Sequence, residues 1–388
     1  MDNSTLNKIN NCLNIVLDFK STNEQRKEAE KYLQLIKDDP KSPIYGYYLA
    51  LRNNNQNNEA RHFGINMIIN AVSYKWNEKT YTDNERNELR RMALDLLKET
   101  GGILEEANYI KEKIVILIVE IAKRSWPNEW TDFDAMLRSL YNKDRNTQQL
   151  VLLIYRNLAQ EVYLDEICSI PELRKKQIAS GLIAVSSSAK VLLNRYDYFQ
   201  QHPENVTKEQ IAEMEIMVQM VRGDYTNEGW LIRFVNTLEN YKEQYLINKM
   251  NNNDIELQQL EQLIVNLLDT LSAFIKWVIF ESLDDINILP KLTSMLVQDF
   301  SYKIKKATLE CAYVLVSRNF HINNEERNKL LFNPLFDGDG LNNILNFWIS
   351  LYDVSNISIQ QLQQIQNSKN LTEDNYKLLL NISEVNFV

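Results

Sequence analysis

The sequence NEARHFGINMIINAVSYKW at residues 58–76 decides the fold class of this chain. Its apolar residues recur at three- and four-residue spacing, which predicts a helix with one buried face. These residues are Ala60, Phe63, Met67, Ala71 and Val72. Gly64 lies within the same stripe, where it costs about 1 kcal/mol of helix propensity relative to alanine. We therefore expect a neighbouring helix to approach the backbone closely at Gly64.

Two more helices follow directly. One is predicted from about Asp83 to the Gly101–Gly102 pair, because glycine commonly ends a helix. The next is predicted from Asn108 to Trp126, and Pro127 then breaks it and favours the first turn of another helix. The links between these helices are short, so we expect neighbouring helices to be antiparallel.

The spacing of the helices indicates a repeat. Helices that could be the second member of a pair begin near Asn23, Asn58, Asn108 and Asn146. Their spacing of roughly 35 to 50 residues is close to the ~40 to 47 of HEAT and armadillo repeats. The sequence therefore predicts an all-α fold, an α-solenoid of HEAT repeats. Such a superhelix has an extended concave surface, which usually binds other macromolecules.

Composition agrees with a helical protein. The 388 residues contain only 9 Gly and 7 Pro, which is low for a sheet-rich chain. Cys12, Cys168 and Cys311 are far apart, as expected for reduced thiols in a core. The first residues lack the apolar segment of a signal peptide, and no run reaches the ~20 apolar residues that cross a bilayer. We expect no membrane insertion.

The net charge of the chain indicates which classes of partner to expect. A net charge of −9 works against a general nucleic-acid binder and favours basic partners. The basic clusters at 174–176 and 303–306 lie on predicted helices. They are either solvated helix faces or contacts for phosphate or RNA.

The sequence contains no recognisable catalytic motif, so we expect that the chain is not an enzyme. His62, His202 and His321 lie far apart and lack a neighbouring Cys or carboxylate at metal-ligand spacing, and the sequence has no glycine-rich phosphate loop. Residues 186–188 are three serines within a long helix predicted from Glu172 to Arg195, with no base nearby. We expect no catalytic residues, no metal and no cofactor.

Several short motifs carry a family resemblance. They are His62-Phe-Gly-Ile, Tyr74-Lys-Trp-Asn, Ile103-Leu-Glu-Glu, Asn108-Tyr-Ile-Lys and Lys123-Arg-Ser-Trp-Pro followed by Trp130. In their order and spacing the chain resembles the N-terminal region of the karyopherin-β (importin-β/exportin) family of nuclear transport receptors. Within that family it is most similar to the exportin-5 branch and its fungal counterpart, which exports phosphorylated proteins. The resemblance covers most of residues 5–350 and is strongest at 58–130.

The resemblance implies a specific biology. Family members are HEAT-repeat receptors that shuttle between nucleus and cytoplasm, pass nucleoporins, and bind the GTPase Ran in its GTP form through their N-terminal repeats. The nucleotide belongs to Ran, and exporters hold cargo together with it. Residues 1–130 would be the Ran-binding repeats, and 131–388 would continue the same solenoid. Family members are several times longer than 388 residues, so we expect this to be a truncated N-terminal region.

Candidate contact residues follow if the second helices line the concave side. For Ran these are His62, Asn66, Asn70, Ser73, Asn108, Tyr109, Lys111, Glu112, Glu120 and Lys123. For a phosphorylated cargo, which needs basic side chains, they are Arg174, Lys175, Lys303 and Lys305. The alternative for each Ran candidate is a solvated helix position, or a helix N-cap in the case of Asn108.

Three functions remain open at this point. The first is a nuclear export receptor that binds Ran-GTP and a protein cargo. The second is a HEAT scaffold that assembles protein complexes without a GTPase. The third is an exporter of double-stranded RNA, which is a cargo of animal exportin-5; the acidity of the chain works against it.

Overall fold

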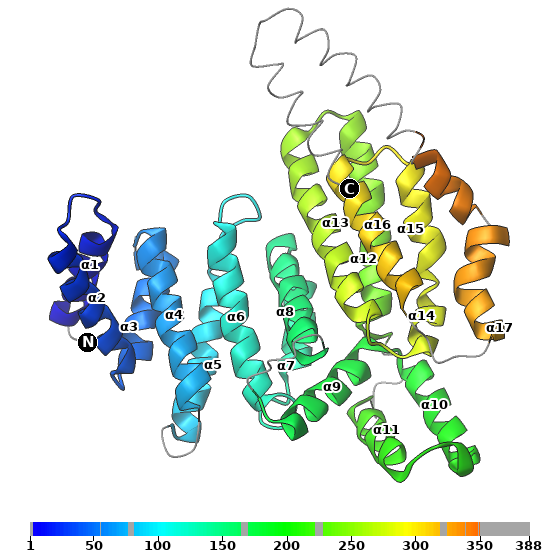
Figure 1. The fold of residues 1–388 in the computed structure, drawn as a ribbon, viewed down its shortest axis with the longest axis horizontal. Helices are drawn as coiled ribbons and strands as arrows, with labels where there is room; N and C mark the ends of the chain where they lie inside the picture. Colours follow the sequence, from blue (N-terminus) through cyan, green and yellow to red (C-terminus); the bar gives the residue numbers. More distant parts are fainter. Residues whose placement is uncertain are drawn as a thin grey trace, which may run out of the picture. The chain divides into compact units, whose positions relative to one another are not determined.

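The computed structural model describes residues 3–349 except 55, 77–80, 164–169, 222–227, 319–323, 338 and 348. Every regular element in these ranges is a helix, which confirms the predicted all-α class (Figure 1). The chain divides into two compact units, residues 1–181 and 182–388, and each is described by itself. The periodic tail predicted from residue 357 lies outside the described residues.

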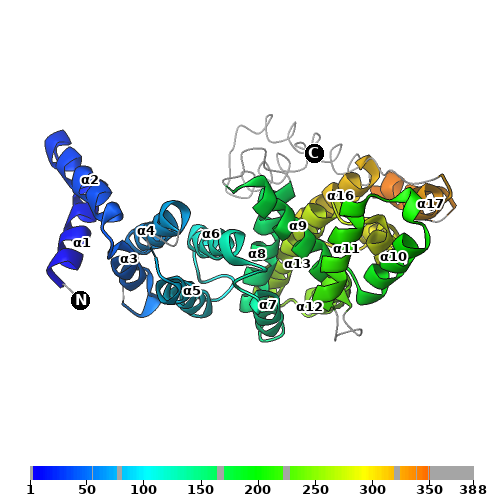
Figure 2. The same ribbon diagram turned by 90° about the horizontal axis from the view of Figure 1, so that it is seen from below.

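The first unit is built of helical hairpins. Its helices are α1 (Asn3–Leu17), α2 (Asn23–Asp38), α3 (Ser42–Ala50), α4 (Asn58–Lys75), α5 (Asp83–Lys98), α6 (Asn108–Ser125), α7 (Phe133–Tyr141), α8 (Arg145–Tyr163) and the first part of α9 (Glu172–Ser186), with a 3-10 turn η1 (Arg52–Asn54). α1 packs on α2, α3 on α4, α5 on α6, and α7 on α8. The second members α2, α4, α6 and α8 contact one another in turn. Figure 2 shows α4, α6 and α8 in one layer and α3, α5 and α7 in the other.

These second helices begin where the sequence predicted. α2, α4 and α6 begin at Asn23, Asn58 and Asn108, and α8 begins one residue before Asn146. Local capping explains the first two starts. The Thr22 hydroxyl accepts a hydrogen bond from Gln25 N at 3.2 Å, and the Asn57 side chain accepts one from Ala60 N at 2.8 Å.

Gly64 lies at a close crossing of two helices, as predicted. A Cβ atom at Gly64 would lie 2.5 Å from the Gly46 carbonyl oxygen of α3, and a Cβ at Gly46 would lie 2.5 Å from the Gly64 carbonyl oxygen of α4. No other residue type fits either position without moving backbone. The loss of helix propensity at Gly64 is therefore offset by packing of α4 against α3.

Cations from later repeats cap the second helices of the first unit. The Lys75 ammonium donates to Asp38 O at 2.9 Å, and the Arg124 guanidinium donates to Ser73 O at 3.0 Å. Arg174 donates to Lys123 O at 2.9 Å at the end of α6. The last carbonyls of α2, α4 and α6 thus gain both a hydrogen bond and a favourable charge at the negative end of the helix dipole.

The second unit continues with helices of less regular length. They are α10 (Ala189–Gln201), α11 (Lys208–Val221), α12 (Gly229–Met250), α13 (Asp254–Ile275), α14 (Phe280–Ile286), α15 (Ile288–Val297), α16 (Tyr302–Ser317) and α17 (Asn324–Arg327), with η2 (Pro203–Asn205) and the π-helical η3 (Asn328–Asp337). α13 packs against both α12 and α16, and α15 also packs on α16. Across the described residues, every helix is too short or too polar to span a lipid bilayer.

The single long helix predicted from Glu172 to Arg195 is wrong. α9 ends at Ser186, and α10 begins at Ala189 with Ser188 as its N-cap. The Ser188 hydroxyl accepts a hydrogen bond from Val191 N at 3.3 Å. Gly229 approaches this junction so closely that a Cβ there would lie 2.4 Å from Ser187 O. The break between α9 and α10 is therefore stabilised by a local cap and by the close packing of a residue far along the chain.

Candidate partner-binding face on α4 and α6

The predicted residues at the N-terminal end of α4 and α6 form one contiguous patch. The Asn66 side-chain nitrogen lies 3.2 Å from His62 Nδ1, and the His62 and Tyr109 rings meet edge to face with centroids 5.8 Å apart. Tyr109 remains 44% exposed. Burial, with a smaller effect of the Lys113 charge, lowers the pKa of His62 below its ordinary value of 6.5. His62 is therefore neutral at physiological pH.

The middle of this face is polar and accessible. Asn70 on α4 is half-buried, and Glu112 on α6 is exposed. Asn108 is exposed as well, but it is the first residue of α6 and does not cap it. The N-cap position is Ala107, which has no side-chain cap hydrogen bond. The alternative role of Asn108 as an N-cap is therefore wrong.

The predicted residues at the C-terminal end of the face contact one another. The Ser73 hydroxyl of α4 lies 3.1 Å from Glu120 Oε2 of α6, and Glu120 also pairs with Lys123 at 2.5 Å. Burial alone would raise the pKa of Glu120, but the charges and hydrogen bonds of Lys123 and Arg124 outweigh it and lower that pKa. Glu120 is therefore ionised at neutral pH although it is buried.

Two residues of this cluster were missed by the sequence analysis. Arg124 pairs with Glu120 at 2.5 Å, and Glu161 of α8 pairs with Lys123. The i, i+4 spacing of Glu120 and Arg124 is a signal that could have identified Arg124. Glu161 belongs to another repeat, and no local spacing connects it to α6.

Lys111 is turned into the protein. It is only 2% exposed, and its ammonium donates to Ile103 O at 2.6 Å and to Gln149 Oε1 at 3.2 Å. Burial lowers its pKa, partly opposed by the charge of Glu106. Lys123 is equally buried. The side chains that a partner can reach on this face are therefore those of His62, Asn66, Asn70, Tyr109 and Glu112, with Ser73 and Asn108 at its ends.

The basic cargo candidates lie in two different units and differ in environment. Arg174 is half-buried and donates to the carbonyls at the end of α6, and burial lowers its pKa. Lys175 is half-buried. Lys303 is exposed and lies 3.4 Å from Glu261, whereas Lys305 is half-buried, with its pKa lowered chiefly by burial. Arg174 thus has a clear structural role at the end of α6.

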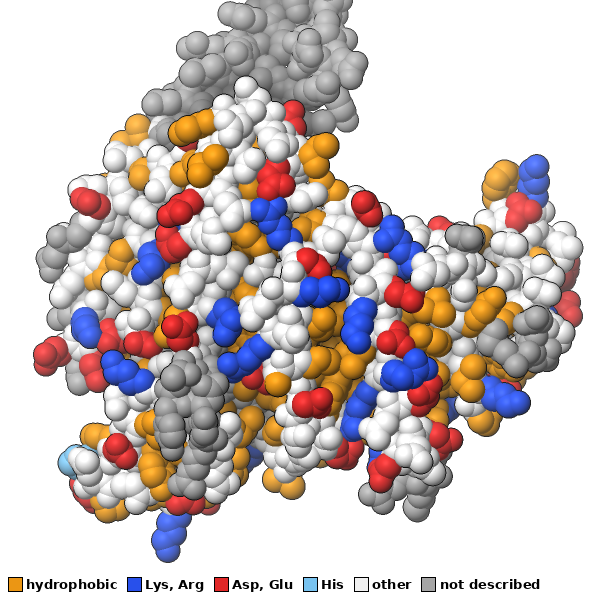
Figure 3. All heavy atoms as spheres, turned by 180° about the vertical axis from the view of Figure 1, so that it is seen from behind, with side chains coloured by type: hydrophobic (Ala, Val, Ile, Leu, Met, Phe, Trp, Pro, Cys, Tyr) orange, Lys and Arg blue, Asp and Glu red, His pale blue; other side chains and the backbone are white. Residues whose placement is uncertain are grey.

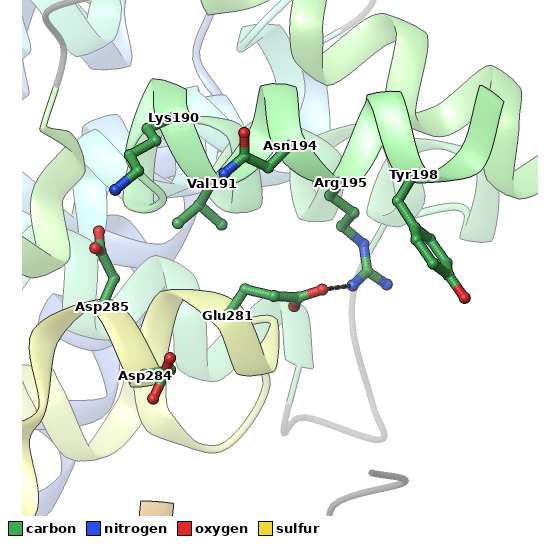
Figure 4. Close-up of a pocket in the computed structure, with 8 residues that line it drawn as sticks. All are labelled: Lys190, Val191, Asn194, Arg195, Tyr198, Glu281, Asp284 and Asp285. Atoms are coloured by element: carbon green, nitrogen blue, oxygen red, sulfur yellow. Dashed lines mark hydrogen bonds and ion pairs between the residues drawn. The ribbon is translucent and has the colours of Figure 1, made fainter. Parts of the chain in front are cut away.

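A polar cavity of 340 Å³ lies between α10 and α14 in the second unit (Figure 4). Its basic wall carries Lys190 and Arg195, and its acidic wall carries Glu281, Asp284 and Asp285. Arg195 pairs with Glu281 at 2.5 Å, Lys329 pairs with Asp284 at 2.6 Å, and the Ser188 hydroxyl donates to Asp285 at 3.1 Å. The three carboxylates of the acidic wall are thus already engaged by neighbouring side chains.

Two family models match this chain, and the residues that they match include both helices of the candidate face. Residues 29–99 match the model described as importin-beta N-terminal domain, and residues 107–221 match the model described as exportin 1-like protein. α4 therefore lies in the first matched region, and α6 opens the second.

Curated relatives extend the match over most of the chain. Protein MSN5 of Saccharomyces cerevisiae is 27% identical over 353 residues, which cover 87% of this chain and 25% of that protein. Exportin-5 of Mus musculus is 26% identical, with coverage of 85% of this chain and 24% of the relative. Exportin-5 of Homo sapiens is 30% identical over 186 residues, 46% of this chain and 15% of the relative. The chain thus spans about a quarter of the length of the relatives that it matches most fully.

Proposed function

This chain belongs to the karyopherin-β family, near exportin-5, and we propose that it acts in a nuclear export receptor that binds Ran-GTP and a protein cargo. The observation that carries the proposal is the match to two exportin-type relatives over 85% or more of this chain. The proposed receptor is not an enzyme. It shuttles between nucleus and cytoplasm and contacts nucleoporins in transit.

The proposed Ran contact is the accessible face of α4 and α6. It offers an aromatic ring, a neutral imidazole and side-chain amides, from Tyr109, His62, Asn66 and Asn70, with Glu112 as its charged member. Tyrosine is enriched among the residues that contribute most to protein interfaces. Lys111, Glu120 and Lys123 support the face from inside, since their charged groups are engaged by other helices. GTP is bound by Ran and not by this chain.

Binding to Ran in its two nucleotide states tests the proposal. The full 388-residue chain is titrated with Ran loaded with GTP and, separately, with GDP. We expect clear preference for the GTP form. Tyr109→Ala should weaken that binding about tenfold or more, because it removes an exposed aromatic ring from the face. Tyr313→Ala is the matched control, since Tyr313 is an exposed tyrosine on α16 in the second unit. Equal or absent binding to both forms by a folded sample would contradict the proposal.

We propose protein as the cargo class, and the fungal resemblance favours phosphorylated protein. Lys175, Lys303 and Lys305 are the proposed cargo contacts. Arg174 joins them only if a cargo reaches the end of α6, where its guanidinium donates to carbonyls.

The alternatives are separated by the same titration. A HEAT scaffold without Ran dependence predicts no response to the nucleotide state of Ran. Double-stranded RNA is disfavoured as cargo because basic and acidic side chains are interspersed over the surface seen in Figure 3 and the net charge is −9.

A further inference from the structure

Glu120 on α6 lies at the centre of a buried group of side chains that joins three consecutive second helices. Its carboxylate accepts a hydrogen bond from the Ser73 hydroxyl on α4 at 3.1 Å and pairs with Lys123 and Arg124 at 2.5 Å each. Lys123 also pairs with Glu161 on α8. A continuous chain of polar contacts therefore runs from α4 through α6 to α8. We call these five residues the α4–α6–α8 network.

Both central groups of this network keep their charge. Burial would raise the pKa of Glu120 and lower that of Lys123, yet the contacts between the partners outweigh burial and lower the first pKa and raise the second. Apolar side chains could fill the same space, but charge-assisted hydrogen bonds are directional and tolerate less rotation. The network thus restricts the rotation of α6 about its own axis relative to α4 and α8.

The relative positions of the side chains on the accessible face depend on the rotation of α6. His62 and Asn66 are on α4, whereas Tyr109 and Glu112 are on α6, so their relative placement changes if either helix turns or shifts. A partner that touches both helices needs one arrangement of these side chains. Contact residues hold such an arrangement best when supporting residues behind them are themselves fixed by hydrogen bonds.

We propose that Glu120 and Lys123 are positioning residues for the α4–α6 face, which do not touch the partner but hold the two helices in the arrangement that it binds. This role rests on the proposed function, because Ran-GTP is the partner whose binding reports it. The geometry assigns two ties to α4, the Ser73 hydroxyl on Glu120 and the Ser73 carbonyl oxygen that accepts from Arg124, and it assigns the tie to α8 to the Glu161 carboxylate.

Two mild variants each weaken one end of the network, and the Glu161 variant is the decisive one because Ser73 itself lies at the edge of the accessible face. Ser73→Ala removes the hydroxyl contact with Glu120 and leaves the Arg124 hydrogen bond to Ser73 O, whereas Glu161→Gln removes the charge on α8 while Lys123 keeps Glu120 as its counter-charge. The full chain is titrated with Ran-GTP at a temperature at which every variant is folded in melting curves. We expect each variant to weaken binding about fivefold. The double variant should weaken it by less than the product, because both changes loosen the same unit.

Controls separate positioning from stability. Leu89→Ala creates a cavity under α5, outside the network, and should lower the melting temperature while leaving the affinity of the folded protein unchanged. Glu161→Asp keeps the charge and should restore part of the affinity lost in Glu161→Gln. If the wild type binds Ran-GTP and both network variants bind it equally well, the positioning role is wrong and the proposed function stands. If folded wild type does not bind Ran-GTP, both are wrong.

Discussion

A single ion pair between Arg61 and Glu106 fixes the connection between α5 and α6 to α4. The guanidinium donates to both carboxylate oxygens, at 2.7 and 3.1 Å, and Gly101 N donates to the same carboxylate at 3.1 Å. Both side chains are almost fully buried. Burial would raise the pKa of Glu106, but these hydrogen bonds and the nearby positive charge outweigh it and lower that pKa.

Glu106→Gln tests how much this ion pair stabilises the fold. The change leaves Arg61 buried without a counter-charge, so the free energy of unfolding at pH 7 should fall by about 3 kcal/mol. The folded pKa of Glu106 lies below its ordinary value of 4.5. The contribution of the carboxylate is therefore complete above that value and is lost as the pH falls through the lower, folded one. Urea unfolding of both proteins from neutral to acid pH should show a gap that narrows below pH 4.5.

The neighbouring carboxylate supplies the control for this experiment. Glu105 is exposed and lies 3.5 Å from Arg52. Exposed pairs contribute about 1 kcal/mol or less, so Glu105→Gln should change the unfolding free energy little. Similar losses of unfolding free energy for Glu105→Gln and Glu106→Gln would contradict the conclusion that the buried pair of Arg61 and Glu106 is the more stabilising one.

Residue-level prediction could not give the direction in which the lysine side chains of α6 point. Helical periodicity placed Lys111 and Lys123 near the candidate face, but it could not show that their ammonium groups turn toward Gln149 and Glu161. Each of those partners lies 38 residues further along the chain. A period of 3.6 residues carries information about one helix and none about the side chains of the next repeat.

Helix starts are the best predicted elements because their signals are local. Thr22 and Thr82 each form a capping box with the residue three positions on, Gln25 and Glu85. The helix break after Ser186 was missed for the opposite reason. It depends on Gly229 and on Ser282, whose hydroxyl donates to Ser187 Oγ at 2.8 Å. Neither residue is near the serines in sequence.

The crossing of α3 and α4 predicts an unusual response to an alanine substitution. Gly64→Ala should gain about 1 kcal/mol of helix propensity, yet we expect a net loss of about 2 kcal/mol in unfolding free energy. The added Cβ would meet the Gly46 carbonyl oxygen and the Leu49 Cβ at 2.5 and 2.8 Å, and neither can move without shifting α3. Thermal and urea unfolding of the purified variant measure the sign.

A second glycine, which lies between α5 and α6, serves as a control for the crowding at Gly64. The atoms nearest to a Cβ at Gly102 belong to the exposed side chain of Glu105, the closest at 3.2 Å, and a flexible exposed side chain can shift at little cost. Gly102→Ala should therefore be tolerated. If Gly64→Ala proved as stable as wild type, the close crossing would not constrain the two helices.

At the scale of the whole chain, acidity predicts weak binding of RNA. The net charge is −9, and phosphate binding needs clustered Lys and Arg. We expect a short double-stranded RNA, titrated with and without Ran-GTP, to bind only at low salt and to be released at about 0.15 M salt. Electrophoretic mobility shifts across a salt series measure this. Tight binding at the higher salt would favour the RNA exporter over the protein exporter.

The all-α class and the helical hairpins of the first unit were predictable from helix period alone, whereas the division after residue 181 was not. The boundary predicted from the sequence was residue 130, where the strongest part of the resemblance ends. That α9 crosses the division explains why no linker composition marks it.

The cations that cap the C-terminal ends of α2, α4 and α6 determine where the chain can be shortened without loss of a helix cap. α2 relies on Lys75, α4 on Arg124 and α6 on Arg174, so each of these three helices receives a hydrogen-bond donor for its last carbonyls from a later helix. A truncation at a hairpin boundary would strip the preceding helix of that donor and fray its last turn. Deletion series that keep α6 capped are therefore better ended well into α9, beyond Arg174, than in the connection between α6 and α7.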